Sequence, residues 1–136
     1  MQLNPYLFFD GRCEEAFKFY EKLLGGAIKA MMTYESAPAE EQGEPEWKNK
    51  IMHATLEIHG APLMGSDAPP KHYSKPAGFS VSLSIDKVAD AERIFGALAD
   101  GGKIGFPLQQ TFWAARFGMV TDRFGIPWMI NCERDA

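Results

Sequence analysis

The second half of the chain repeats the pattern of the first, and an internal repeat constrains a fold more firmly than local propensities do. An offset of 76 places Leu7 on Leu83 and the glycine pair 25–26 on the pair 101–102. Further along, an offset of 65 places residues 60–64 (Gly-Ala-Pro-Leu-Met) on residues 125–129 (Gly-Ile-Pro-Trp-Met). The offset changes because the acidic segment 35–50 lengthens the first copy only. The chain therefore holds two copies of one unit.

The residue pattern of each copy predicts one strand, then a helix, then three further strands. In the first, the apolar run 3–9 predicts a buried strand that Asp10-Gly11 interrupts. Apolar residues at helical spacing from Cys13 to Leu24 then predict a helix that stops at the glycine pair. The remaining strands of this copy are predicted over 27–34, 52–59 and 61–66. The expected fold class is α+β, with two tandem βαβββ modules.

The module boundaries follow from a change in composition. Module one spans 1–66, a segment containing Pro, Lys and Ser over 67–76 is interpreted as a linker, and module two spans 77–136. A chain of 136 residues with 46% apolar content is the size of one globular domain. We therefore expect a single domain over 1–136.

Charge and cysteine content exclude several classes of partner. The formal net charge of −4 does not favour binding to nucleic acid. The sequence contains no apolar run of the roughly eighteen residues that a membrane helix needs. Two cysteines, Cys13 and Cys132, are too few for a disulfide framework, and the N-terminus lacks a signal-peptide pattern. We expect a cytoplasmic protein with reduced thiols in which both cysteines pack in the core.

Two parts of the chain resemble a known family. These are residues 4–16, which begin Asn-Pro-Tyr-Leu-Phe-Phe, and residues 111–131, which contain Phe-Gly-Met-Val-Thr-Asp-Arg-Phe-Gly. They are similar to the PhnB-like branch of the vicinal-oxygen-chelate superfamily, which includes glyoxalase I, bleomycin resistance proteins and dioxygenases. The resemblance implies modules that curl into a half-open barrel around a cavity, and it implies pairing as a homodimer. Some members carry a methyltransferase label, yet this sequence has no glycine-rich, nucleotide-cradling turn after a strand.

Metal-using members of this superfamily hold a divalent ion with His, Gln or Glu at four equivalent strand positions. The repeat places these positions at Asn4 (or Pro5), Met64, Ser80 and Met129. Amide, hydroxyl and thioether groups do not form a tight site for such an ion, so we predict no metal and no cofactor. A rival metal hypothesis uses His53, Glu57 and His59 on the polar face of one strand. Glu57 and His59, roughly 7 Å apart, could share an ion, whereas His53 and His59, about 20 Å apart, could not. His72 in the linker could add a further ligand.

Strand alternation selects the residues that face a cavity. Because the helices must cover the apolar strand faces, the opposite faces carry the polar candidates. Arg116 lies amid aromatic residues and suits an anionic or aromatic ligand, or else pairs on the surface with the acidic segment. His53 and Glu57 would be roughly 13 Å apart, too far for a direct hydrogen bond. The predicted ligand-binding residues are Tyr6, His53, Thr55, Glu57, Ser80, Trp113, Arg116 and Met129.

The leading interpretation is a glyoxalase-fold protein without the superfamily's metal ligands that binds a small aromatic or amphipathic molecule. One alternative is a metal-dependent lyase, isomerase or dioxygenase with displaced ligands; another is a metal-free catalyst using His53, Glu57 or Arg116. A third is a structural protein whose cavity is filled by its own apolar side chains. No catalytic residue is assigned, and the acidic segment is expected to be a lid or a floppy loop.

Overall fold

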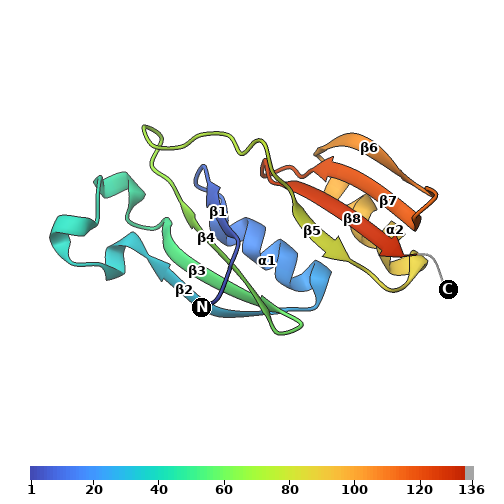
Figure 1. The fold of residues 1–136 in the computed structure, drawn as a ribbon. Coiled ribbons are helices and arrows are strands. Elements are labelled where there is room, and N and C mark those ends of the chain that lie inside the picture. Colours follow the sequence, from blue (N-terminus) through green and yellow to red (C-terminus); the bar gives the residue numbers. More distant parts are fainter. Residues whose placement is uncertain (134–136) are drawn as a thin grey trace. The chain divides into compact units, whose positions relative to one another are not determined.

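The computed structural model describes residues 1–133, which form two βαβββ modules in succession (Figure 1). Module one contains β1 (Tyr6–Phe9), α1 (Cys13–Leu24), β2 (Ala27–Thr33), β3 (Ile51–Ile58) and β4 (Ala61–Asp67). Module two contains β5 (Val81–Ser84), α2 (Val88–Ala99), β6 (Lys103–Gln109), β7 (Ala114–Thr121) and β8 (Pro127–Glu133). The predicted α+β fold of tandem βαβββ modules is confirmed. The chain divides into two compact units, Met1–Ser74 and Lys75–Ala136.

Both sheets have the same strand order. In the first sheet this order is β1-β4-β3-β2, and in the second it is β5-β8-β7-β6. The first and last strands of each module pair in parallel, whereas the other neighbours are antiparallel. Tyr6 lies opposite Met64, and Ser82 lies opposite Met129. The two sequence offsets are thus preserved in the register of the strands.

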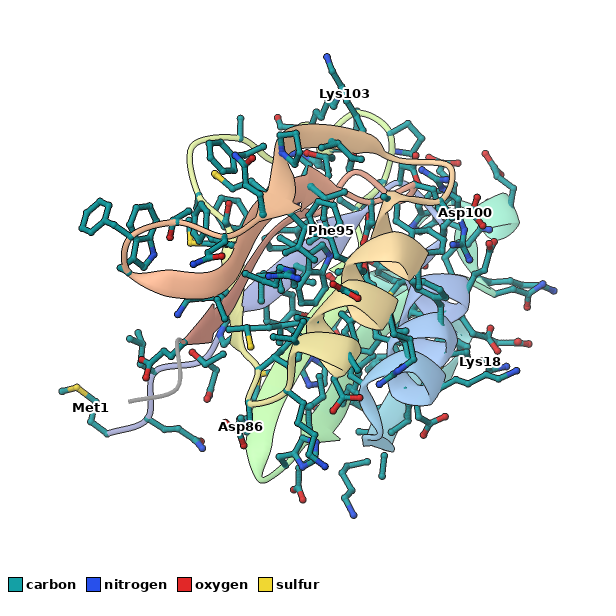
Figure 2. All side chains as sticks on the ribbon, turned by 90° about the vertical axis from the view of Figure 1, so that its right-hand side faces the viewer. Met1, Lys18, Asp86, Phe95, Asp100 and Lys103 are labelled. Carbon is teal, nitrogen blue, oxygen red and sulfur yellow. The ribbon has the colours of Figure 1, made fainter. Side chains whose placement is uncertain are left out.

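Each helix covers one face of its own sheet. The apolar stripe of α1, including Phe17 and Tyr20, is fully buried against strand residues such as Leu7 and Leu56. Gly65 is needed at this contact, because a Cβ there would lie 2.9 Å from the ring of Phe17. In module two the equivalent contact is made by Phe95 of α2 (Figure 2), because a Cβ at Gly118 would lie 2.7 Å from the Phe95 ring. A close approach of helix to sheet at a glycine is therefore repeated in both modules.

The C-terminal end of α1 matches its sequence signal. Gly25 takes the left-handed conformation with φ 73°, and its N–H donates to the carbonyl of Glu21 at 3.1 Å. On the solvent side, Lys18 pairs with Glu14 one turn earlier and points outward (Figure 2).

No helix within residues 1–133 has the length and apolarity needed to cross a membrane.

A buried carboxylate, Asp67, connects three parts of module one. One carboxylate oxygen accepts from the backbone N–H groups of Gly11 and Cys13, and the other accepts from that of Ile51. Asp67 is 1% exposed and is the last residue of β4. Its assignment to the linker was wrong, because these three donors hold it inside the sheet. It fixes the start of α1 and the start of β3 against the end of β4.

The acidic segment between β2 and β3 is anchored at both ends. It contains three short 3-10 turns, Tyr34–Ser36, Ala39–Glu41 and Pro45–Trp47. The backbone N–H of Tyr34 donates to the carbonyl of Lys50, and the Lys50 ammonium donates to the carbonyl of Gly11 at 3.0 Å. The expected long excursion is confirmed, and its three turns and anchored ends were not predicted.

Candidate functional site

The face of the first sheet that α1 leaves uncovered carries the polar candidates of module one. On β3, Ala54 and Leu56 are fully buried, whereas His53 and Thr55 are partly exposed. Thr55 lies opposite Met64 on β4, which in turn lies opposite Tyr6 on β1. The sidedness that strand alternation predicted for β3 is confirmed.

A line of hydrogen bonds joins three of the predicted site residues. The Tyr6 hydroxyl lies 3.1 Å from Nδ1 of His53, and Nε2 of His53 lies 3.1 Å from the Thr55 hydroxyl. A neutral imidazole donates through one nitrogen and accepts through the other, so two proton arrangements satisfy this line. In either arrangement both hydroxyls hold the imidazole ring in place. We call Tyr6, His53 and Thr55 the hydroxyl–imidazole line.

Apolar side chains border this line. The rings of Tyr6 and Phe8 lie 5.2 Å apart, and the two side chains are 38% and 52% exposed. On the other side, Met32 of β2 lies opposite His53 and is 43% exposed. The face therefore offers hydrogen-bonding groups between exposed apolar groups, an arrangement that suits an amphipathic molecule.

Glu57 lies further along β3 and is not part of the line. It is exposed, and its neighbours in register are Ala27 and Pro62. Both ring nitrogens of His53 are engaged by Tyr6 and Thr55. The structure therefore does not bring His53 and Glu57 together as an acid and base pair.

In module two, the predicted residues are distributed over two regions. Met129 lies opposite Ser82 and Met119, on strand positions that alternate with the buried Trp128 and Ile130. Trp113 lies in the connection between β6 and β7, where its ring contacts those of Phe112 and Phe117 at 4.8 and 5.4 Å between centroids. Ser80 precedes β5 and is therefore outside the sheet.

Arg116 is engaged in an ion pair with α2. Its Nε donates to the carboxylate of Glu92 at 3.2 Å, and its terminal nitrogen donates to the carbonyl of Ala115. On β7 it lies opposite Cys132, which is buried, whereas Phe117 lies opposite Asn131. Arg116 and Phe117 thus occupy opposite faces of the sheet. The partner of Arg116 is a helix residue of its own module and not the acidic segment.

The strand register also identifies the positions that correspond to the superfamily's metal ligands. Tyr6 and Ser82, rather than Asn4 and Ser80, lie opposite Met64 and Met129. The corrected set supplies a phenol, a hydroxyl and two thioethers, and these donors do not fit a divalent Zn, Ni, Mn or Fe ion. Within residues 1–133, no three His, Cys, Asp or Glu side chains lie together in a way that could hold a metal ion.

The rival pair, Glu57 and His59, does not share a strand face. β3 ends at Ile58, and His59 and Gly60 form a two-residue hairpin turn with φ values of 49° and 82°. Positive φ at both positions is typical of the turn that best matches the twist of paired strands. The orientation of His59 is therefore set by the turn. The prediction that Glu57 and His59 share an ion depended on strand alternation, which does not extend to His59.

Cys13 is confirmed as a core residue. Its side chain is fully buried at the start of α1. Burial raises the pKa of the Cys13 thiol above its ordinary value, and the nearby carboxylates of Asp67 and Glu14 raise it further. The thiol is thus kept protonated, which is unfavourable for a nucleophile. Cys132 is also buried, and the two cysteines form no disulfide.

Tandem βαβββ modules with parallel pairing of first and last strands define the glyoxalase, or vicinal-oxygen-chelate, class of proteins. Residues 1–131 match the family described as 3-demethylubiquinone-9 3-methyltransferase, and the chain belongs to this PhnB-like family. Among curated proteins, it is 38% identical over 139 residues to Protein YjdN of Escherichia coli K12, covering 96% of this chain and 95% of that protein.

Solved structures support the same assignment. The crystal structure of PA1353 from Pseudomonas aeruginosa is 49% identical with a TM-score of 0.90, and 99% of each chain is covered. The PhnB protein from Bacillus cereus is 23% identical with a TM-score of 0.83, covering 97% of this chain and 99% of its own. The fosfomycin resistance protein FosX from Listeria monocytogenes, at 8% identity and a TM-score of 0.66, covers 98% and 94%. The last two show the fold alone.

The family description names a methyltransferase. The positions of the glycines in this chain show whether it has a glycine-rich turn that could hold a nucleotide-like cofactor. The glycine pairs 25–26 and 101–102 follow α1 and α2, where they end helices. After β1, a single glycine, Gly11, precedes α1, and after β5 the chain runs Ile85-Asp86-Lys87 into α2. Neither connection has the several glycines that let a backbone approach a nucleotide-like cofactor closely.

Proposed function

We propose that this protein binds a small aromatic or amphipathic molecule on the face of the first sheet that α1 leaves uncovered. The observation that carries the proposal is the hydroxyl–imidazole line of Tyr6, His53 and Thr55, bordered by exposed apolar side chains. The two hydroxyls, which the imidazole holds in place, would hydrogen-bond the polar part of the ligand. The rings of Tyr6 and Phe8 would stack on its apolar part. Glu57, at the end of this face, would contact a ligand that extends along β3.

Module two supports the proposal with a second group of the same kind. The aromatic side chains of Phe112 and Trp113 are 87% and 48% exposed, although large apolar side chains are usually buried. Met129, a flexible and polarizable side chain, is partly exposed on the second sheet. Trp113 and Met129, and Ser80 beside β5, remain predicted ligand contacts. Arg116 remains a predicted ligand contact only if a ligand displaces the carboxylate of Glu92 from its guanidinium group.

Native mass spectrometry on protein purified without chelator tests this proposal. We expect a retained organic mass, or saturable binding of the amphipathic aromatic probe anilinonaphthalene sulfonate. The substitution His53→Ala should weaken binding of that mass or probe by about tenfold, the worth of one or two hydrogen bonds. His72→Ala, a change at an exposed histidine outside the sheets, is the matched control. Equal binding by both variants would exclude the hydroxyl–imidazole line as the site.

We propose further that the protein acts as a homodimer in the cytoplasm. Each sheet ends in edge strands whose unpaired backbone groups favour a partner, and the exposed Phe79 and Ile104 add apolar surface. Two buried cysteines without a disulfide suit a reducing compartment. The same mass spectra report the number of chains per particle, and a monomer at micromolar concentration would contradict the dimer.

A further inference from the structure

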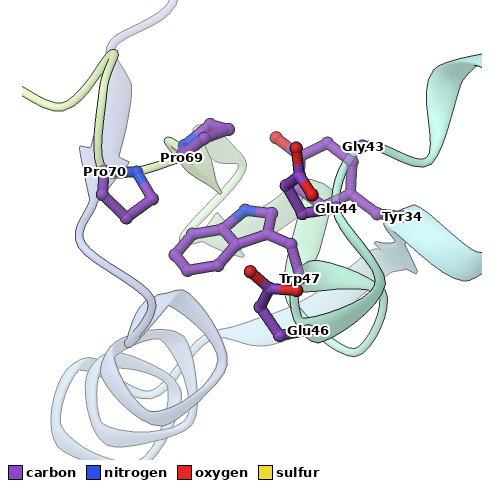
Figure 3. Close-up of a pocket in the computed structure, with 7 residues that line it drawn as sticks. All are labelled: Tyr34, Gly43, Glu44, Glu46, Trp47, Pro69 and Pro70. Carbon is purple, nitrogen blue, oxygen red and sulfur yellow. The ribbon is translucent and has the colours of Figure 1, made fainter.

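A small cavity lies between the acidic segment and the chain that follows β4. Its volume is about 150 Å³, roughly the space that a molecule of benzene occupies in an apolar protein cavity. Its walls come from Tyr34, Gly43, Glu44, Glu46, Trp47, Pro69 and Pro70, all within the first unit. Figure 3 shows the indole of Trp47 between the two prolines and the two glutamates. None of these residues belongs to the hydroxyl–imidazole line.

Two walls of this cavity, at Tyr34 and Pro69, are held by hydrogen bonds within module one. The Tyr34 hydroxyl donates to the carbonyl of Asp67 at 2.8 Å, so the phenol ring is held against β4. Burial raises the pKa of Tyr34, with Asp67 adding to the effect, so this hydroxyl keeps its proton. Pro69 follows Ala68, whose N–H donates to the carbonyl of Phe9. Rigid walls favour binding because little conformational entropy is lost.

The aromatic wall already accepts a cation. The Lys50 ammonium, which donates to the carbonyl of Gly11, lies 6.0 Å from the centroid of the Trp47 ring. Indole faces attract cations through the ring quadrupole, and aromatic walls of this kind recognise quaternary ammonium groups. The lining residues around Trp47 include no basic side chain of their own.

The two glutamates give the cavity a negative sign. Glu44 and Glu46 are both exposed, and neither has an ion pair or hydrogen bond from its carboxylate among residues 1–133. Two unpaired carboxylates beside an apolar, aromatic wall offer charge attraction to a cation and a dry surface to its alkyl groups. A neutral apolar molecule would use only the second of these features.

The geometry therefore points to a binding site for a small alkylated ammonium group at Tyr34, Trp47, Pro69 and Pro70, with Glu44 and Glu46 supplying the counter-charge. The ligand class is a quaternary or methylated amine of choline size. The aromatic and proline walls surround the methyl groups, while the carboxylates stay in solvent and act at the mouth of the cavity.

Comparing the binding of choline with that of its uncharged isostere dimethylbutanol separates the effect of ligand charge from the effect of ligand shape. The readout is the ¹H–¹⁵N resonance of the Trp47 indole in the full-length protein, with the resonance of the buried Trp128 as internal reference. We expect choline to shift the Trp47 resonance saturably in the millimolar range, and dimethylbutanol to bind about tenfold more weakly. Equal binding of the two compounds, or no shift with choline, would overturn the proposal.

The glutamates provide variants that leave the fold intact because both side chains are exposed. The double variant Glu44→Gln/Glu46→Gln should weaken choline binding by about tenfold. The matched control is Glu40→Gln/Glu41→Gln, which removes the same charge from the same segment outside the cavity. Equal weakening in both double variants would mean a general effect of net charge and would overturn the assigned site.

Discussion

The carboxylate of Asp67 accepts a hydrogen bond from the backbone N–H of Cys13 at 2.9 Å, although 54 positions separate the two residues. This bond satisfies one of the N–H groups that the first turn of a helix leaves without a partner. The residue that precedes α1, Arg12, makes no side-chain cap. A distant strand residue thus performs the capping that a local side chain usually provides. Its negative charge is also favourable at a helix N-terminus, where the helix dipole is positive.

Replacing this carboxylate should destabilise module one. In Asp67→Asn, an amide N–H₂ group would face a backbone N–H donor in a buried position, and we expect a loss of roughly 3 kcal/mol in the free energy of unfolding. Urea denaturation followed by circular dichroism measures this loss. Asp86→Asn is the control, because Asp86 is exposed. A difference below about 1 kcal/mol between the two variants would argue against the capping role.

Two glycines should respond in opposite directions to the same substitution. Gly65→Ala would place a Cβ 2.9 Å from the Phe17 ring and 3.0 Å from the Leu7 carbonyl, so we expect a cost of about 1–3 kcal/mol from overpacking. Gly96→Ala, within α2, meets no heavy atom within 4 Å and should stabilise the protein by about 0.5–1 kcal/mol. Thermal unfolding of both variants checks the pair, and a stable Gly65→Ala protein would contradict the close contact.

The buried thiol of Cys13 predicts a pH dependence of stability. The pKa of this thiol is raised in the folded state from a reference of 9.0, so the native state binds its proton more tightly than the unfolded state. The resulting stabilisation is fully present below pH 9 and is lost as pH rises above it. Between pH 7 and pH 10, wild type should therefore lose more stability in urea than Cys13→Ala. Identical losses would mean that the thiol ionises equally in both states.

The hydroxyl–imidazole line predicts a specific NMR response. Tyr6→Phe removes the hydroxyl that engages Nδ1 of His53, while the ring that contacts Phe8 remains. We expect the ring ¹⁵N shifts of His53 to change, because the balance between its two proton arrangements depends on both hydroxyls. His72, exposed and outside the sheets, should keep its shifts. Unchanged His53 shifts would contradict the hydrogen bond to Tyr6.

The fold was accessible from the sequence because the repeat carries register information. The offsets of 76 and 65 relate Tyr6 to Ser82 and Met64 to Met129, and these residues face each other pairwise in the two sheets. The start of each first strand was predicted too early. Apolar composition extends to Leu3, but pairing with β4 begins only at Tyr6. That error of two positions selected Ser80 in place of Ser82.

The site was only partly accessible from the sequence. Alternation gave the correct face for His53 and Thr55. The contact of His53 with Tyr6, however, depends on the spatial order β1-β4-β3, which places strands from opposite ends of the module side by side. Asp67 was missed because the prolines that follow it resemble a linker. A charged residue directly after an apolar strand is the signal that could have indicated it. Trp47 was missed because the acidic segment has no periodicity.

The parallel pairing of β1 with β4 also sets the order of events during folding. Met64 is synthesised 58 residues after Tyr6, so the first sheet cannot close until nearly the whole of module one has left the ribosome. The acidic segment lies within this interval and lengthens the loop to be closed. Because closure entropy grows only logarithmically, doubling such a loop costs only about 0.6 kcal/mol. The segment that forms the walls around Trp47 can thus change in length with little thermodynamic penalty to the sheet that supports it.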